Sequence, residues 1–168
     1  NSDVAGMAAL IGQHRLDPNA HPQYATQTAI QTASLVYAKD VGAVNAYRAN
    51  YTPAISALVD GMTLGCQATS SNAAAATFAV NDLPAKPLLG ASQVPLQGGE
   101  IKSGGKFIAM WHADAASWIL LWASGGAVQV GNATQSAHAV PLAQAQAIAA
   151  AAVKKSAPRK LMMFIGSA

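Results

Sequence analysis

Acidic residues are the first place to look for chemistry, because acid–base hydrolysis needs two carboxylates that the fold brings together. The chain has 168 residues, and only seven of them are acidic. They are Asp3, Asp17, Asp40, Asp60, Asp82, Glu100 and Asp114. Most stand alone in sequences typical of turns, such as Asp60-Gly61. We therefore expect a protein that is not an enzyme.

Nucleophilic and phosphate-binding motifs give catalysis no better support. Cys66 lies in an apolar run typical of a β-strand, where a small buried thiol is commoner than a nucleophile. The sequence has no G-x-S-x-G motif. Gly98-Gly99 and Gly104-Gly105 do not form the G-x-x-x-x-G-K-[ST] pattern of a phosphate loop.

The sequence supports metal binding better than it supports catalysis. Of the four histidines, His14 and His21 flank a turn that contains two prolines. If three parallel chains met with this turn on their axis, one histidine per chain would bring three imidazoles together. We keep His21 as the candidate ligand of such an axial metal ion, the one cofactor that the sequence suggests. A histidine that packs or hydrogen-bonds is the commoner alternative.

Aromatic residues are concentrated in one predicted hairpin. The runs Lys106–Trp111 and Trp118–Trp122 flank Asp114-Ala115-Ala116, which is typical of a turn between two strands. The tryptophans Trp111, Trp118 and Trp122 are most simply read as core residues. The alternative is that an exposed ring stacks on a sugar, and Trp111 and Trp118 are then the candidate ligand-binding residues.

Basic residues do not point to nucleic acid. The net charge is +3, and a small cluster lies around Pro158. Its members are Lys154, Lys155, Arg159 and Lys160. No aromatic platform or recognition motif accompanies it, so a solvated helix end is favoured over a phosphate-binding surface. No window of eighteen strongly apolar residues predicts insertion into a membrane.

The composition indicates a surface that is covered by other chains. Hydrophobic residues make up 52% of the sequence, but alanine is so frequent among them that the core must be thin. Charged residues make up 10%, against about 25% in ordinary soluble domains. A free monomer normally depends on that charged coat for its solubility. We therefore expect assembly, with small residues at 1–40 and 127–153 allowing close approach.

The elements expected along the chain are mainly β-strands with short helices. Helical spacing predicts helices at 1–16, 25–37 and 142–155. Turn signals separate short β-prone runs that predict a small antiparallel β-sandwich or barrel. These runs are Val44–Tyr51, Met62–Thr69, Ala75–Val80, Lys106–His112 and Ser117–Trp122. A further short strand is expected at 127–130, and residues 161–165 suggest a strand that continues into a longer protein.

Several segments carry a family resemblance. The residues that carry it are Thr52–Ile55 through Asp60-Gly61-Met62, Ala73–Asn81, Ala85-Lys86-Pro87, Leu96–Lys106 and Asn132–Val140. The turn Asp17–Tyr24 is similar to the D-P-H-P-Q-Y motif, with Asn19-Ala20 inserted. Together they resemble the receptor-binding tail fibres of contractile-tailed bacteriophages and of R-type pyocin-like bacteriocins. The match covers most of residues 17–145 and rests on short motifs.

The resemblance implies an elongated, parallel homotrimer on a virion or phage-tail-like particle. Such fibres attach the particle to a bacterial cell-surface glycan, usually lipopolysaccharide. We expect a helical or extended shaft at 1–41, a β knob at 42–123, and a linker with an alanine-rich helix at 124–168. The expected function is that of a non-enzymatic structural segment. A glycan-binding module with exposed tryptophans and a polysaccharide-degrading tailspike are the alternatives.

Overall fold

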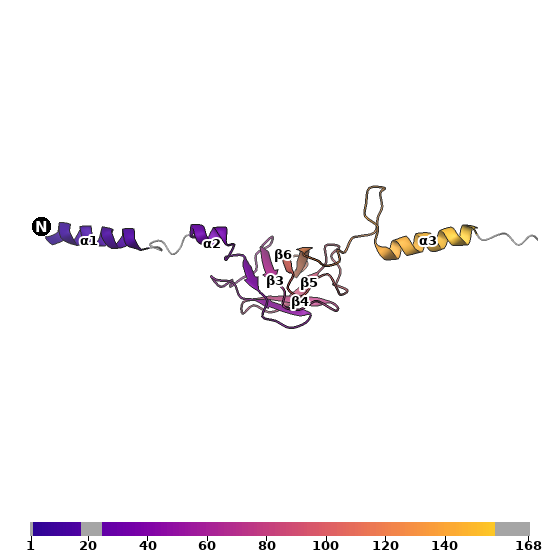
Figure 1. Cartoon of the computed structure of the whole chain (residues 1–168), viewed down its shortest axis with the longest axis horizontal. Coiled ribbons are helices and arrows are strands. Elements are labelled where there is room, and N and C mark those ends of the chain that lie inside the picture. The colour runs from indigo at the N-terminus through magenta and orange to yellow at the C-terminus, as the bar shows by residue number, and fades with distance from the viewer. Residues whose placement is uncertain (1, 18–24, 157–168) are drawn as a thin grey trace, which may run out of the picture.

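The strands gather in the middle of the chain, with a helix projecting on either side (Figure 1). The computed structural model describes residues 2–17 and 25–156. Its helices are α1 (Ser2–Leu16), α2 (Gln27–Gln31) and α3 (Leu142–Ser156). Its strands are β1 (Tyr37–Lys39), β2 (Ala46–Ala49), β3 (Thr63–Gln67), β4 (Ala76–Val80), β5 (Lys86–Leu89), β6 (Lys106–His112) and β7 (Ser117–Ala123). The fold is mainly β with few helices, as predicted.

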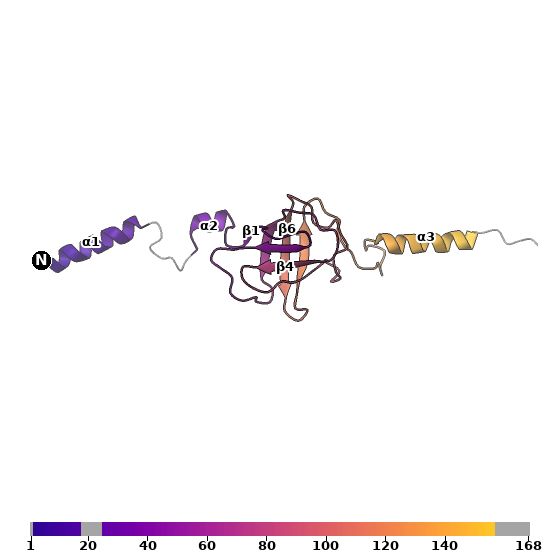
Figure 2. The same cartoon turned by 90° about the horizontal axis from the view of Figure 1, so that it is seen from below.

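All seven strands belong to one mixed sheet, in the order β1-β3-β6-β7-β5-β4-β2. A bridge between Asp40 and Ala49 joins the ends of the outer strands β1 and β2, so the sheet nearly closes on itself. In Figure 2, β4 runs across the direction of β6, as expected for a sheet that curls round its core. We call residues 37–123 the barrel. Closure protects backbone groups that an open edge would expose.

Of the two predicted architectures, an antiparallel β-sandwich or barrel, the structure has the barrel, and it corrects the sandwich and the purely antiparallel pairing. One sheet, rather than two stacked sheets, surrounds the core. Three neighbouring pairs are parallel: β1 with β3, β2 with β4, and β5 with β7. Parallel strands need long crossovers, whereas turn residues reveal only local hairpins such as β6–β7. Local signals therefore predict five of the seven strands of this sheet but not how the strands pair.

A chain of five aromatic rings fills the barrel. The ring centroids lie 5.5 Å apart for Tyr47 and Phe107, 5.5 Å for Phe107 and Phe78, 5.2 Å for Phe78 and Trp118, and 5.5 Å for Trp118 and Trp111. All five side chains are buried. Tilted and edge-to-face pairs at such distances add about 0.5–1.5 kcal/mol each to the gain from burial. The core role predicted for Trp111 and Trp118 is confirmed.

A β-bulge in β7 reverses the alternation at the end of that strand. Ala109 in β6 pairs with Leu120. The residue before it, Ile108, pairs with Trp122, which leaves Leu121 as an extra residue in β7. Bulges of this kind change the direction of the side chains that follow. Trp122, which the sequence placed in the core, consequently turns outward and is 52% exposed.

The segments outside the barrel follow the predictions in part. Helices α1 and α3 match the predicted ranges to within a residue, whereas α2 is shorter than predicted. No strand forms at 127–130. The first strand, β1, lies inside the segment expected as shaft. The proline turn at 18–24 and the expected strand at 161–165 lie outside the described residues.

Candidate functional site

The tryptophans that the sequence nominated for ligand binding lie in the core. Trp111 is 7% exposed and Trp118 is fully buried, and their rings pack edge to face against each other. A ring in that position offers no face to a ligand that arrives from solvent. The tryptophan of this hairpin that reaches the surface is Trp122, so any site that uses an exposed indole must be built around it.

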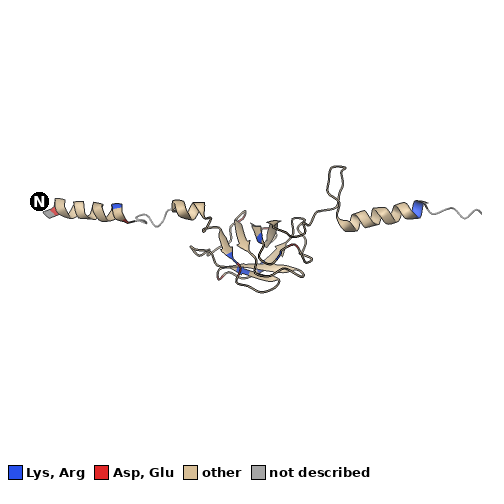
Figure 3. Cartoon of the chain, viewed as in Figure 1, with Lys and Arg blue, Asp and Glu red and all other residues tan. Residues whose placement is uncertain are grey.

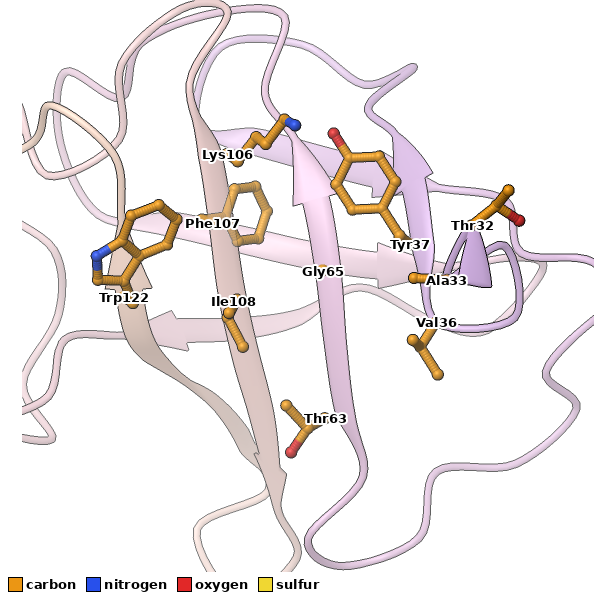
Figure 4. Close-up of a pocket in the computed structure, with 10 residues that line it drawn as sticks. All are labelled: Thr32, Ala33, Val36, Tyr37, Thr63, Gly65, Lys106, Phe107, Ile108 and Trp122. Carbon is orange, nitrogen blue, oxygen red and sulfur yellow. The ribbon is translucent and has the colours of Figure 1, made fainter. Parts of the chain in front are cut away.

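Trp122 lies at one side of a hollow on the outer surface of the barrel. The cavity has a volume of about 480 Å³. Its lining comes from the turn after α2 and from β1, β3, β6 and β7. The lining residues are Thr32, Ala33, Val36, Tyr37, Thr63, Gly65, Lys106, Phe107, Ile108 and Trp122. We call this cavity the outer groove, and Figure 4 shows its side chains.

Strand register places four of the lining residues in one row across the sheet. Tyr37 pairs with Gly65, Gly65 with Ile108, and Ile108 with Trp122. Figure 4 shows the Tyr37 and Trp122 rings at opposite ends of the row, with Gly65 and Ile108 between them. The row thus carries an aromatic side chain at each end, with Gly65 and the side chain of Ile108 between them.

Gly65 is the position in this row over which the Tyr37 ring packs. A Cβ atom at this position would lie 3.0 Å from Cδ2 of Tyr37, closer than almost all real Cβ contacts. Any larger residue would therefore push against the tyrosine ring and displace it. A glycine inside a strand often marks such a close approach. The missing side chain at Gly65 lets the Tyr37 ring pack against the sheet at one end of the groove.

Polar groups stand at the rim of the outer groove. The ammonium group of Lys106 lies 5.5 Å from the centre of the Tyr37 ring, within the range of a cation–π interaction. The Thr63 hydroxyl donates a hydrogen bond to the Gly61 carbonyl at 3.1 Å and keeps its acceptor capacity. The lining contains no carboxylate. The groove is therefore apolar at its centre, with hydroxyl groups and one positive charge around it.

Buried carboxylates lie elsewhere in the barrel and serve its loops. Glu100 Oε1 accepts hydrogen bonds from the Gln97 N–H at 2.7 Å and from Gln129 Nε2 at 2.8 Å. Its Oε2 accepts from the Gly98 N–H at 2.8 Å and from Asn72 Nδ2 at 2.7 Å. Burial raises the pKa of this carboxyl, but the donated hydrogen bonds outweigh that effect and bring its pKa to about 2.

Asp40 is held in the same way. Burial alone raises the pKa of its carboxyl, but hydrogen bonds from Thr69, Arg48 and Gly42 lower it below the usual value. Both Asp40 and Glu100 thus stay ionised and fully occupied at neutral pH. An acid–base catalyst instead needs a pKa near the working pH and a free contact with its substrate. These two carboxylates act as loop anchors.

The single cysteine is equally unsuited to chemistry. Cys66 is buried, and its burial raises the pKa of the thiol to about 12. The nucleophilic form of cysteine is the thiolate, which is scarce at such a pKa. The predicted role of Cys66 as a small buried core residue agrees with its position in the barrel.

Metal binding stays a prediction. His21, the candidate ligand of an axial metal ion, lies outside the described residues. Within residues 2–17 and 25–156, no group of three His, Cys, Asp or Glu side chains is placed to hold a metal ion. In the same part of the chain, no helix has both the length and the apolar character needed to cross a bilayer.

The sequence carried little sign of the outer groove. Trp122 lies in the run Trp118–Trp122, where every residue is apolar, so no alternation tells inside from outside. Tyr37 is the last residue of the helix that the sequence predicts at 25–37, so nothing in the sequence indicates a strand there. The importance of Gly65 follows from cross-strand register alone.

Comparisons with known proteins give no family assignment. No protein-family model matches the chain, and a search of curated proteins finds no significant similarity.

Proposed function

We propose that this protein is a non-enzymatic structural segment of a homotrimeric tail fibre, through which a phage or phage-tail-like particle attaches to the bacterial surface. The observation that carries the proposal is the exposure of apolar side chains along both long helices. The resemblance of the segments between residues 17 and 145 to such fibres supplies the biological setting.

Helix α1 presents large apolar side chains to solvent. Those of Val4, Met7, Leu10 and Ile11 are all at least 60% exposed. Charged groups stand near the helix ends, with Asp3 in the first turn and Arg15 in the last (Figure 3). A helix of about 12–15 residues is marginal in water by itself, so α1 needs a partner along its uncharged length.

Helix α3 has the same character on the other side of the barrel. Leu142, Ile148 and Val153 are at least 60% exposed, and the charges are confined to Lys154 and Lys155 in the last turn. Alanine fills most of the remaining positions and allows close packing of neighbouring helices. Parallel copies of the chain would cover α1 with α1 and α3 with α3.

The barrel then forms the thick part of an elongated assembly. Its own core is complete within one chain, because the five aromatic rings are buried without outside help. Assembly is therefore needed by the helices rather than by the barrel. This division supports a fibre in which helical segments join the copies and the barrel projects from the shaft.

The absence of an enzymatic role is part of the proposal. A polysaccharide-degrading tailspike would need two carboxylates that face a substrate. The two buried carboxylates of the barrel, Asp40 and Glu100, are instead saturated with hydrogen bonds. Their arrangement favours a structural part over a hydrolase.

Sedimentation equilibrium of the full 168-residue chain tests the assembly. We expect a species of about 51 kDa, three times the 17.0 kDa of one chain, at micromolar concentration. Negative-stain images should show a rod with a thicker middle. The variant Leu10→Lys, which puts charge on α1, should reduce the mass, while Val59→Lys, at an exposed barrel position, should not. A stable 17.0 kDa monomer would overturn the proposal.

A further inference from the structure

We propose that neighbouring copies of this chain contact one another, head to tail around the shaft, through oppositely charged ends of their barrels. The acidic end carries Asp60 and Asp114, and the basic end carries Lys39, Lys102 and Lys106. The partner at each end is a second copy of the chain, so the inference rests on the proposed function for the parallel assembly. It adds a contact between barrels to the contacts between helices.

Strand register gathers the three lysines at the start of β6. Gln67 in β3 pairs with Lys39 in β1 and with Lys106 in β6, so these two lysines share one row across the sheet. Lys102 lies in the turn before β6, where its carbonyl accepts a hydrogen bond from the Gly105 N–H at 2.9 Å. All three lysines are exposed. The basic end is therefore a positively charged surface on one side of the barrel.

The acidic end lies where β6 finishes. The Ala113 N–H donates a hydrogen bond to Asp60 Oδ1 at 2.8 Å, which ties the turn before β3 to the turn after β6. Asp60 can offer its other carboxylate oxygen to a partner, and the exposed Asp114 follows Ala113 in the same turn. A strand rises about 3.4 Å per residue, so the two ends of the seven-residue β6 lie about 20 Å apart.

Two buried carboxylates near the basic end leave its surface positive. Asp40 is 1% exposed and Glu100 is 3% exposed, and hydrogen bonds from the chain already occupy their oxygens. Three exposed lysines thus stand against two inaccessible carboxylates. The other charged side chains of the barrel lie on β2, in the turn after β4, and on β5; they are Arg48, Asp82 and Lys86.

The orientation of β6 points these two ends at neighbouring copies. In Figure 1 the barrel lies to one side of the line through α1, α2 and α3. Figure 2 looks along the direction of that displacement and shows β6 running across the line. The ends of β6 therefore point round the shaft, rather than along it or away from it. A threefold axis along the helices would bring each acidic end to the next basic end, which is a head-to-tail contact that closes into a ring.

The contact would set the alignment of the copies more than their stability. Exposed ion pairs are individually weak, whereas complementary charges favour one register and disfavour others. Helix α3 needs such a device, because alanine is its commonest residue and neighbouring alanines offer similar surfaces to a partner helix. The charged ends would hold three such helices in one register.

Chemical cross-linking of the full 168-residue chain tests the contact. Ala115→Cys places a thiol beside Asp114, and Ser103→Cys places one beside Lys102; both positions are exposed, whereas the native Cys66 is buried. The ends of one barrel are about 20 Å apart, so a short bis-maleimide joins them only between copies. We expect the chain with both substitutions to give covalent trimers on a denaturing gel, and each single variant to give no linked species.

Charge reversal in this two-cysteine chain tests whether charge holds the ends together. Asp114→Lys should lower the yield of linked trimer about threefold, and adding Lys102→Glu should restore it, because the two ends then attract again. Asp82→Lys, at an exposed turn outside both ends, is the matched control and should leave the yield unchanged. Salt at 1 M, where the Debye length is about 3 Å, should lower the yield without any reversal. A thermal melt of each variant verifies that the barrel is folded.

The outcomes separate this inference from the proposed function. If light scattering shows a trimer but the two-cysteine chain gives no linked species, the barrel contact is wrong and the fibre segment stands. Linked species from a single variant would mean that like ends meet, and a yield indifferent to Asp114→Lys and to salt would remove charge as the cause; either result overturns the inference. A wild-type chain that scatters as a monomer overturns the proposed function itself, and the inference with it.

Discussion

The carboxylate of Asp40 accepts two hydrogen bonds from Thr69, one from its hydroxyl at 2.6 Å and one from its backbone N–H at 3.2 Å. The other carboxylate oxygen accepts from the backbone N–H groups of Gly42, at 2.8 Å, and Arg48, at 3.0 Å. One side chain thus ties the end of β1 to β2 and to the segment after β3. It lies at the place where the barrel closes.

Asp40→Asn should destabilise the barrel by about 2–3 kcal/mol, because an amide nitrogen in place of one oxygen cannot accept the hydrogen bonds it received. Urea unfolding followed by tryptophan fluorescence measures the loss. Asp82→Asn, at an exposed turn position, should change the free energy of unfolding by less than about 0.5 kcal/mol. Equal effects of the two variants would contradict the anchoring role of Asp40.

Stability should fall in acid. The pKa of Glu100 is about 2 and that of Asp40 is also lowered, so both lie below their values in the unfolded chain. The unfolded chain therefore binds more protons in acid, and the stabilisation is present above about pH 5 and lost as the pH falls towards 2. Thermal midpoints between pH 7 and pH 2.5 measure this loss. Glu100→Gln should flatten the profile, and a wild-type profile already flat over that range would exclude the mechanism.

Acrylamide should quench one of the three tryptophans strongly. Trp111 and Trp118 are buried, whereas Trp122 is exposed on the outer surface of β7. We expect a biphasic quenching curve for the wild type. Trp122→Phe should remove the accessible component and leave the blue-shifted emission of the other two. If the accessible component persists in Trp122→Phe, the bulge does not turn this side chain outward.

Two glycines with positive φ should differ in their tolerance of a methyl group. Gly98 has a φ of 115°, and an added Cβ would lie 2.7 Å from the Ala73 carbonyl oxygen. Gly104 has a φ of 74°, and an added Cβ would meet nothing within 4 Å. Gly104→Ala should cost about 1–2 kcal/mol through its backbone conformation alone. Gly98→Ala should cost about 1–3 kcal/mol more from the clash, and urea unfolding compares the two.

Elements that depend on neighbouring residues were predictable from the sequence. The β6–β7 hairpin was found because its turn and its two apolar runs are adjacent, and α3 was found because alanine continues for three turns. Strand β1 was missed because three residues carry no period. Strand β5 was missed because Pro87 resembles a turn signal, although proline is tolerated at suitable positions in a strand.

Features that depend on the register between strands could not be predicted from the sequence. The parallel pairs bring together segments that no local signal connects. The bulge at Leu121 decides that Trp122, rather than Trp111 or Trp118, reaches the surface. A uniformly apolar run cannot reveal such a shift of the inward and outward positions, so the sequence does not tell which of the three tryptophans is exposed.

The bridge between Asp40 and Ala49 makes the closed barrel depend on one short segment of the chain. Residues 37–49 supply both outer strands, since β1 covers β3 and β2 covers β4. A single proteolytic cut that released residues 37–49 would leave β3 and β4 without their outer neighbours at the same time. The remainder would be an open sheet with two edges ready to pair with another chain. Protection against β-aggregation therefore rests on one short stretch that precedes most of the sequence it shields.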